Sequence, residues 1–259
     1  MSKNQNGVVT YSSENNIGTI EFYHPKGNSL PKTLLIKLAE TITKAGEDPS
    51  NQILVLRSAG EGAFCAGASF DELMKITNFD EGKEFFMGFA KVINAMRTCP
   101  KLILCRVHGK TVGGGIGIIS AADFVVAMQG ASIKLSELTL GIGPFVVGPA
   151  VGRKLGVASF TTLALDANTW YDAEWALSHG LFNKLTGSTA ELDSEVHRLS
   201  AELAGSNPDA LAHLKDVLWQ ATGHWGSTLE QRAEISGQLV LSEYTKRFID
   251  NYKKGEIKL

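Results

Sequence analysis

Two glycine-rich segments and one glutamate are the parts of this chain best suited to chemistry. The first segment, Gly60 to Ser69 (GEGAFCAGAS), consists mostly of small residues, which let a backbone approach a ligand closely. Ser69 and Glu72 then fit the capping-box pattern S-x-x-E at a helix start, so nearby N–H groups should point outward. A tight glycine turn before a capped helix explains the segment equally well.

The second segment, Thr111 to Gly117 (TVGGGIG), is also expected at a junction between a strand and a helix. Two such junctions could supply two backbone N–H groups to one developing oxyanion. Close packing of a helix against a strand is the simpler explanation of a triple glycine. The segment is not a phosphate-binding P-loop, because no Lys-Ser or Lys-Thr follows it, and it lacks clean G-x-G-x-x-G spacing.

Glu137 is the candidate acid/base. It lies among apolar neighbours in the segment Lys134 to Gly141 (KLSELTLG), and burial there would raise its pKa toward that of a useful general base. A surface or structural glutamate is the alternative. The six histidines show no ligand spacing, so no metal site is expected. Cys65 has no nearby Cys/His pattern that would support a nucleophile.

Alternating strands and helices must position these residues. Strands are expected over 8–11, 17–23, 53–57, 102–107 and 124–128, the first two joined by a turn at Asn15-Asn16. Helices are expected over 31–44, 83–96, 195–204, 208–220 and 228–252. The alternation predicts an α/β fold. Because the pattern becomes helical near residue 194, we predict a core over 1–193 and a helical region over 194–259.

Composition favours a soluble cytoplasmic protein. The 259 residues carry a formal net charge of −2 with no block of one sign, so nothing attracts nucleic acid or an anionic membrane. No apolar run approaches the roughly 18 residues of a membrane span, and Met1 to Gly7 do not resemble a signal segment. The three cysteines, an odd number without metal-ligand spacing, favour free thiols in a reducing compartment.

Together, in this order, the three segments resemble the crotonase superfamily of enoyl-CoA hydratases and isomerases, and the similarity extends over residues 8–255. Residues 64–68 resemble the family's A-F-C-A-G-A-D loop, and residues 113–115 resemble its G-G-G turn. Residues 136–141 resemble its P-E-x-x-L-G segment, and residues 172–181 its A-x-E-A-x-x-x-G-L-V signature. The resemblance implies a spiral of ββα repeats with a C-terminal helical region that forms trimers, often paired as hexamers.

The resemblance also implies the roles of individual residues. The N–H groups of Ala68 and Gly114 would hold the thioester carbonyl of an acyl-CoA as it becomes an enolate, and Glu137 would be the acid/base. Residues implied in substrate binding are Lys26, Gly27, Ser29, Ala66, Ser69, Phe70, Gly113, Ser136 and Leu140. Coenzyme A enters as part of the acyl-CoA substrate, so no separate cofactor is expected.

Three positions depart from the family pattern. Gly117 replaces the second glutamate of the two-glutamate hydratases, Ser136 replaces the usual proline, and Ser69 replaces an aspartate. A single remaining base could still activate water for addition at C3 of an enoyl thioester, or move a proton between C2 and C4. We predict that Gly117→Glu raises hydration of crotonyl-CoA by up to roughly 10²-fold if the neighbouring side chains leave room.

The loop Gly141 to Pro149 resembles that of bacterial methylglutaconyl-CoA hydratases of leucine breakdown. We therefore expect hydration of a 2-enoyl-CoA, for which a branched or carboxylated acyl group is one option. A Δ3,Δ2-enoyl-CoA isomerase is the first alternative, related decarboxylases and thioester hydrolases stay open, and a non-catalytic acyl-CoA-binding protein is the alternative from another class. Aromatic residues expected to be exposed on the late helices favour a trimer, although packing within the chain would also explain Trp219, Trp225, Phe248 and Tyr252.

Overall fold

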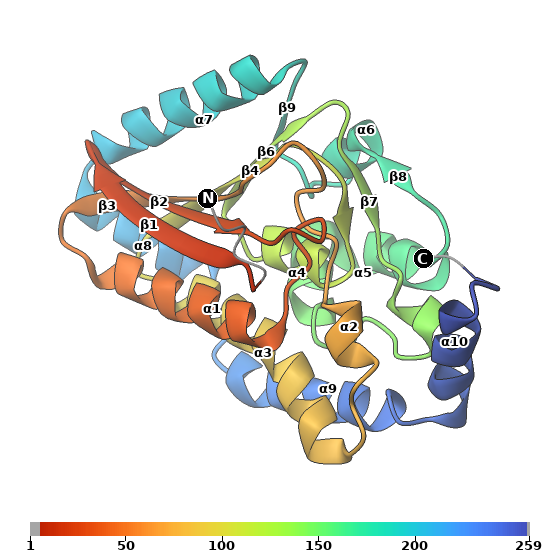
Figure 1. Cartoon of the computed structure of the whole chain (residues 1–259). Coiled ribbons are helices and arrows are strands. Elements are labelled where there is room, and N and C mark those ends of the chain that lie inside the picture. Colours follow the sequence, from red (N-terminus) through yellow and green to blue (C-terminus); the bar gives the residue numbers. More distant parts are fainter. Residues whose placement is uncertain (1–5, 258–259) are drawn as a thin grey trace.

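A six-stranded sheet is the framework of residues 6–257, the part of the chain that the computed structural model describes (Figure 1). The strands follow the order β1 (Val8–Glu14), β2 (Asn16–Tyr23), β3 (Asn51–Ser58), β4 (Leu102–Val107), β6 (Phe124–Met128) and β9 (Lys184–Thr186). Only β1 and β2 pair antiparallel, and the other pairs are parallel. The predicted hairpin is confirmed, because Asn15 and Asn16 have φ of 53° and 63°, as its tight turn requires.

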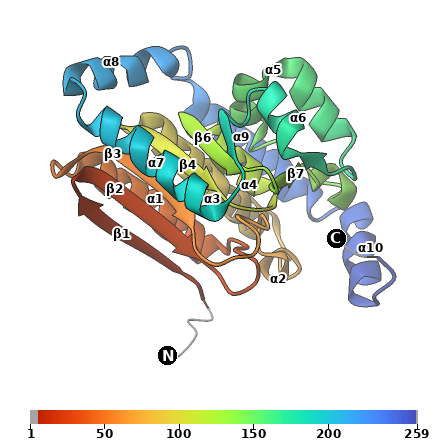
Figure 2. The same ribbon diagram turned by 90° about the horizontal axis from the view of Figure 1, so that it is seen from above.

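Helices cover both faces of this sheet (Figures 1 and 2). Helices α1 (Lys32–Glu47) and α3 (Phe79–Thr98) lie on one face and α7 (Thr189–Ala204) crosses the other. The side chains of β3 point alternately to the two faces of the sheet. Leu54 and Leu56 belong to the core that contains α1 and α3, whereas Ile53 and Val55 pack with α7. The predicted α/β fold is confirmed.

A smaller sheet carries the segments around the second glycine cluster. It consists of β5 (Thr111–Val112), β7 (Ser132–Lys134) and β8 (Tyr171–Asp172). The remaining short helices are α2 (Phe70–Leu73), α4 (Gly114–Ser120), the 3₁₀ turn η1 (Glu137–Leu140) and α6 (Ala173–Ser178), and the longer helix α5 (Gly148–Leu165) follows η1. Because β5 leads directly into α4 and β7 precedes η1, this sheet brings the triple glycine close to the predicted catalytic glutamate.

The C-terminal part is helical but differs in two respects from the prediction. It comprises α8 (Pro208–Leu218), α9 (Trp225–Leu239) and α10 (Glu243–Lys253), so the helix expected over 228–252 is interrupted, and Ser242 caps α10. The expected exposure of Trp219 and Trp225 is wrong: each is 6% exposed, and their rings meet edge to face at 5.9 Å. Phe248 and Tyr252 are half-buried. A domain boundary after residue 193 would divide α7, whose inner face packs on the sheet.

Asp123 fixes the C-terminal helices to the core. Its carboxylate accepts hydrogen bonds from Lys215 Nζ, Trp219 Nε1 and the N–H of Ile103, each at 2.7 Å. The side chains of Lys215 and Asp123 are 3% and 5% exposed, so removing one partner would leave a buried charge without compensation. The contact holds α8 beside the start of β6.

Helix α9 packs along α3 through two glycines. A Cβ at Gly82 would lie 2.7 Å from the carbonyl oxygen of Gly237, so the two backbones are in direct contact. Lys83 forms ion pairs with Glu230 and Glu234 beside this crossing. The close approach brings the second half of α9, including Ser236, next to the cavity described below.

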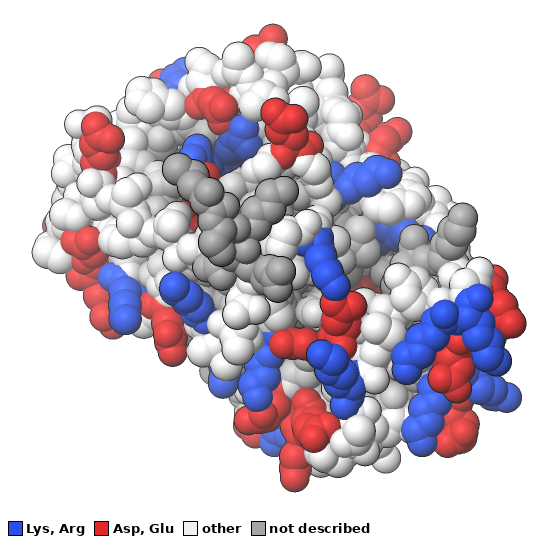
Figure 3. Space-filling view, in the orientation of Figure 1, with Lys and Arg blue, Asp and Glu red and all other residues white. Residues whose placement is uncertain are grey.

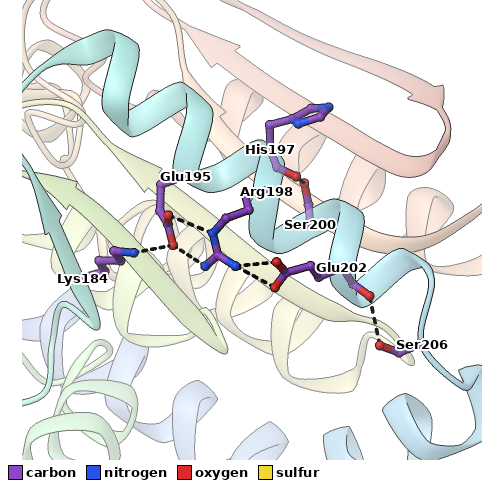
Figure 4. A network of polar contacts seen from close by, with 7 residues as sticks. All are labelled: Lys184, Glu195, His197, Arg198, Ser200, Glu202 and Ser206. Carbon is purple, nitrogen blue, oxygen red and sulfur yellow. Dashed lines mark hydrogen bonds and ion pairs between the residues drawn. The ribbon is translucent and has the colours of Figure 1, made fainter.

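Surface charges are paired or intermixed on the faces in view. On α7, Arg198 bridges Glu195 and Glu202, and Lys184 also contacts Glu195 (Figure 4). Exposed pairs of this kind contribute little to stability, because solvent screens them. Figure 3 shows positive and negative residues interspersed over one face, including α10. These charges form no continuous field of one sign.

Candidate active site

A cavity of about 280 Å³ lies where the two glycine-rich segments, η1, α3 and α9 meet. Eight of the residues predicted for the site line it: Ala66, Ala68, Phe70, Gly113, Gly114, Ser136, Glu137 and Leu140. Most of the remaining wall is apolar and includes Leu73, Phe86, Phe89, Val146 and Val147. The cavity therefore combines a hydrophobic wall with a few polar groups, as ligand sites usually do.

Backbone hydrogen bonds hold the two glycine-rich segments together. Cys65 and Thr111 form an isolated parallel bridge, in which the N–H of Val112 donates to Cys65 O at 2.9 Å. A Cβ at Gly67 would lie 3.0 Å from Val112 O and 3.8 Å from Gly114 N. The segments thus approach each other so closely that only glycine, with its φ of 85°, fits at position 67.

The N–H groups of Ala68 and Gly114 are available to a ligand. Gly114 begins α4, and the first N–H groups of a helix have no partner within it. Within residues 6–257, no acceptor takes a hydrogen bond from the Ala68 N–H, while the flanking Ser69 N–H donates to Leu30 O at 3.1 Å. Both residues line the cavity. The pair therefore has the chemistry of an oxyanion hole.

Phe89 explains why position 114 has no side chain. A Cβ at Gly114 would lie 2.2 Å from Phe89 Cε1 on α3, closer than any two such atoms can approach. Gly113 has φ 53° and ψ −121°, a conformation that other residues rarely adopt. This backbone turn points the start of α4 toward the cavity only because both positions are glycine.

Four predicted substrate-binding residues lie outside the cavity lining. Lys26 forms an exposed ion pair with Asp71. Ser29 contacts the ring of His24, and Ser69 is buried. Gly27 is adjacent to the lining, because its carbonyl accepts a hydrogen bond from Ala66 at 3.1 Å. Their binding roles stay predictions.

Ser69 does cap α2, but the predicted capping box is only half formed. Its Oγ accepts from the N–H of Glu72 at 3.4 Å. The carboxylate of Glu72 does not return to Ser69 and instead accepts from the N–H of Lys32 at 2.7 Å, at the start of α1. Glu72 thereby joins two helix starts. The four-residue helix α2 is fixed to α1 by this bond.

Asn28 is a positioning residue that the sequence reasoning did not single out. Its side-chain amide donates to Ala59 O and Ala63 O at 2.9 Å each, and its φ is 57°. It therefore ties the turn after β2 to the first glycine-rich segment. Its signal in the sequence was its place next to Gly27, because Asn and Gly are the residues that most readily adopt positive φ.

The carboxylate of Glu137 lies at the second glycine turn. A Cβ at Gly113 would be 3.3 Å from Glu137 Oε1 and 3.7 Å from Oε2. Oε2 is buried and has no hydrogen-bond partner in the described residues. The residue as a whole is half-buried, because one side of it opens to the cavity, but protein atoms surround the carboxylate.

Burial raises the pKa of Glu137 to about 7, and a contact with its own backbone N–H opposes the shift. The charged form loses water without gaining a compensating partner, so the carboxyl group titrates near neutral pH. A group with this pKa can both accept and return a proton at physiological pH. The structural alternative for Glu137 does not explain an unpartnered oxygen in a ligand-sized cavity.

Val147 occupies the space that a side chain at position 117 would need. A Cβ at Gly117 would lie 2.4 Å from Val147 Cγ1 and 2.7 Å from its Cβ, and Val147 is itself buried. The predicted gain from Gly117→Glu depended on room that the structure does not provide. Among the residues described as lining the cavity, Glu137 is the one carboxylate.

Helix α10 contacts two residues of the cavity wall. Thr245 Oγ1 donates to Leu140 O at 2.9 Å, and the ring of Tyr252 meets that of Phe70 at 4.6 Å. Leu140 and Phe70 both line the cavity. The C-terminal helix therefore connects η1 with α2, a contact that local sequence patterns do not contain.

Several other lining residues were not predicted. Lys134 could have been found, because it begins the segment Lys134 to Gly141 and lies three residues before Glu137. Trp170 and Ser236 come from distant segments and reach the cavity only through tertiary packing. Their positions in the sequence carry no local signal of this kind.

Comparisons with known proteins agree with this geometry. Residues 12–253 match the family model described as enoyl-CoA hydratase/isomerase. The chain belongs to the enoyl-CoA hydratase/isomerase family. A carnitinyl-CoA dehydratase of Escherichia coli strain K12 is 29% identical over 238 residues, covering 85% of this chain and 89% of that protein. A carnitinyl-CoA dehydratase of Citrobacter koseri is 29% identical over 195 residues, covering 74% and 73%.

Solved structures show the same fold. An enoyl-CoA hydratase/isomerase from Xanthobacter autotrophicus Py2 has a TM-score of 0.85 at 21% identity and covers 95% of this chain and 93% of that one. An enoyl-CoA hydratase from Bacillus halodurans has a TM-score of 0.84 at 21% identity, with coverage of 93% and 98%. None of the helices among residues 6–257 is long and apolar enough to cross a membrane.

Proposed function

We propose that this chain adds water to a 2-enoyl-CoA thioester, with Glu137 as the single acid/base. The observation that carries the proposal is the unpartnered, buried Oε2 of Glu137 beside the turn that presents Gly114. The pKa of about 7 supports a group that both takes and returns a proton. The apolar wall from α3 supports a hydrocarbon chain next to the thioester.

The proposed reaction uses the two backbone donors and the carboxylate in sequence. The N–H groups of Ala68 and Gly114 donate to the thioester oxygen, which favours the enolate. Glu137 accepts a proton from water while the water oxygen bonds to C3 and the C2–C3 π electrons move into the enolate. The proton on Glu137 then passes to C2, and the carbonyl reforms. One carboxylate thus serves first as base and then as acid.

The isomerase is the second candidate. In it Glu137 would take a proton from C2 of a 3-enoyl thioester and return it at C4, and the same oxyanion hole would hold the dienolate. Relatives named dehydratases support water chemistry, because dehydration is hydration in reverse. A branched or carboxylated substrate, as in leucine breakdown, and a cytoplasmic location stay proposals that rest on the sequence patterns.

Kinetics on a panel of thioesters test the proposal. Crotonyl-CoA and 3-methylglutaconyl-CoA report hydration, and a 3-enoyl-CoA reports isomerisation. Turnover of the 2-enoyl substrates above that of the 3-enoyl substrate is the expected result. The reverse order would favour the isomerase. Binding of acyl-CoA without turnover of any substrate would favour the non-catalytic acyl-CoA-binding protein.

A further inference from the structure

Two lysines share one indole ring at the edge of the cavity. Lys134 lines the cavity from β7, and Lys110 immediately precedes the neighbouring strand β5. The Nζ atoms of Lys110 and Lys134 lie 4.9 Å and 5.9 Å from the ring centroid of Trp170. Trp170 also lines the cavity and is 43% exposed. Cation–π contact thus holds two positive charges near the same opening.

These charges have no acidic partner. Neither ammonium group forms an ion pair with a carboxylate in the described part of the chain. The acidic residue in the cavity lining, Glu137, is buried without a hydrogen bond to either lysine. Two like charges at one ring repel each other, and a bound anion would relieve that repulsion.

We infer that Lys134 and Lys110 form an anion site that binds a negatively charged group of the acyl-CoA ligand, with Trp170 keeping the two ammonium groups in place. The inference rests on the proposed function for the identity of the ligand. Two parts of such a ligand have the required chemistry, namely a carboxylate at the end of the acyl chain and the phosphates of coenzyme A. An acyl chain that ends in a cation would be repelled.

Binding of unreactive thioesters tests the site. Glutaryl-CoA and pentanoyl-CoA have saturated chains of equal length and differ in a terminal carboxylate. Calorimetry gives their Kd with the wild type, Lys134→Gln, Lys134→Arg and the double variant Lys110→Gln/Lys134→Gln. Loss of one charge-assisted contact should weaken binding of the relevant probe by about tenfold in Lys134→Gln, while Lys134→Arg retains affinity. The control is Lys37→Gln, which removes an exposed lysine on α1.

The probes distinguish the two sources of the anion. Weakening confined to glutaryl-CoA would assign the acyl carboxylate. Equal weakening for both thioesters, together with unchanged affinity for a pantetheine thioester that lacks the nucleotide, would assign the phosphates. The inference would be overturned if the double variant bound every probe with an affinity within about twofold of that of the wild type. It would also be overturned if the wild type bound none of the probes. Because these probes do not react, a chain that binds through Lys134 but hydrates no enoyl-CoA would refute only the proposed reaction.

Discussion

The carboxylate of Glu137 lies against the space that a side chain at Gly113 would occupy. A Cβ at position 113 would lie 3.3 Å from Oε1 and 3.5 Å from Cδ of Glu137. Because Gly113 has no side chain, the Glu137 carboxylate can lie beside the residue that directly precedes Gly114. The triple glycine therefore serves two purposes: it turns a backbone donor toward the cavity and leaves space for the acid/base beside it.

Stability should depend on the pH through Glu137. Its pKa is 4.5 in the unfolded chain and about 7 in the fold, so the folded protein retains a proton that the unfolded chain releases. The stabilisation is fully present below the unfolded pKa and is lost as the pH rises through the folded pKa. Glu137→Gln stays neutral, so its free energy of unfolding should exceed that of the wild type by about 1–3 kcal/mol at neutral pH and above.

Urea denaturation of both proteins across this pH range measures the difference. The gap between them should grow as the pH rises from about 4.5 to about 7 and then level off. A gap that does not change with pH would show that the carboxylate is not desolvated in solution.

Gly117→Glu should destabilise the protein and should not increase crotonyl-CoA hydration. The new Cβ would collide with Val147 at 2.4 Å, and overpacking of this kind typically costs about 1–3 kcal/mol. The double variant Gly117→Glu/Val147→Ala removes the contact of 2.4 Å with Val147 Cγ1 but keeps the one of 2.7 Å with its Cβ, so it should recover only part of the lost stability. Thermal unfolding and hydration rates check both variants, with Val147→Ala as the matched control. A stable single variant with faster hydration would contradict the steric argument.

Gly114→Ala should lower kcat for the preferred substrate by about 10²-fold or more, the effect of losing one oxyanion donor. The added methyl group would lie 2.2 Å from Phe89 Cε1, so either the start of α4 or the Phe89 ring in the cavity wall must shift. Gly130→Ala is the control, because a Cβ there has no neighbour within 4 Å. Similar kcat values for the two variants would argue against an oxyanion role for position 114.

A trimer or a hexamer is expected in solution. The exposed apolar side chains Val157, Leu165 and Val217 are 77%, 71% and 58% accessible on the single chain, and association would cover them. Trp219 and Trp225 no longer support this expectation, because they pack within the chain. Light scattering determines the mass. A monomer at micromolar concentration would contradict the prediction.

The sequence predicted those features that depend on local patterns. Short β-rich and apolar runs defined the strands, and helical spacing placed Leu34, Leu38 and Ile42 of α1 in the core, where they are buried. The small residues around Ala68 and Gly114 indicated close backbone approach, since glycine conformation is a local property. The same reasoning placed Glu137 among apolar neighbours, which is the cause of its raised pKa.

Contacts between distant segments could not be predicted in this way. The collision between position 117 and Val147 depends on how the segment before α5 packs on α4. The bond from Glu72 to the N–H of Lys32 replaced a local capping box, because the start of α1 was close enough in space to compete for the carboxylate. The same holds for Trp170, whose place beside Lys134 follows from the pairing of β7 with β8.

Turnover of Glu137→Gln tests the central claim most directly. Glutamine keeps the size of the side chain but cannot accept the proton, so kcat on the preferred acyl-CoA should fall by about 10²-fold or more. The affinity for a saturated acyl-CoA should stay nearly unchanged, because binding rests on other residues. This loss of kcat with intact binding is the result that the account predicts. A variant that retains most of its turnover would contradict the single-base mechanism.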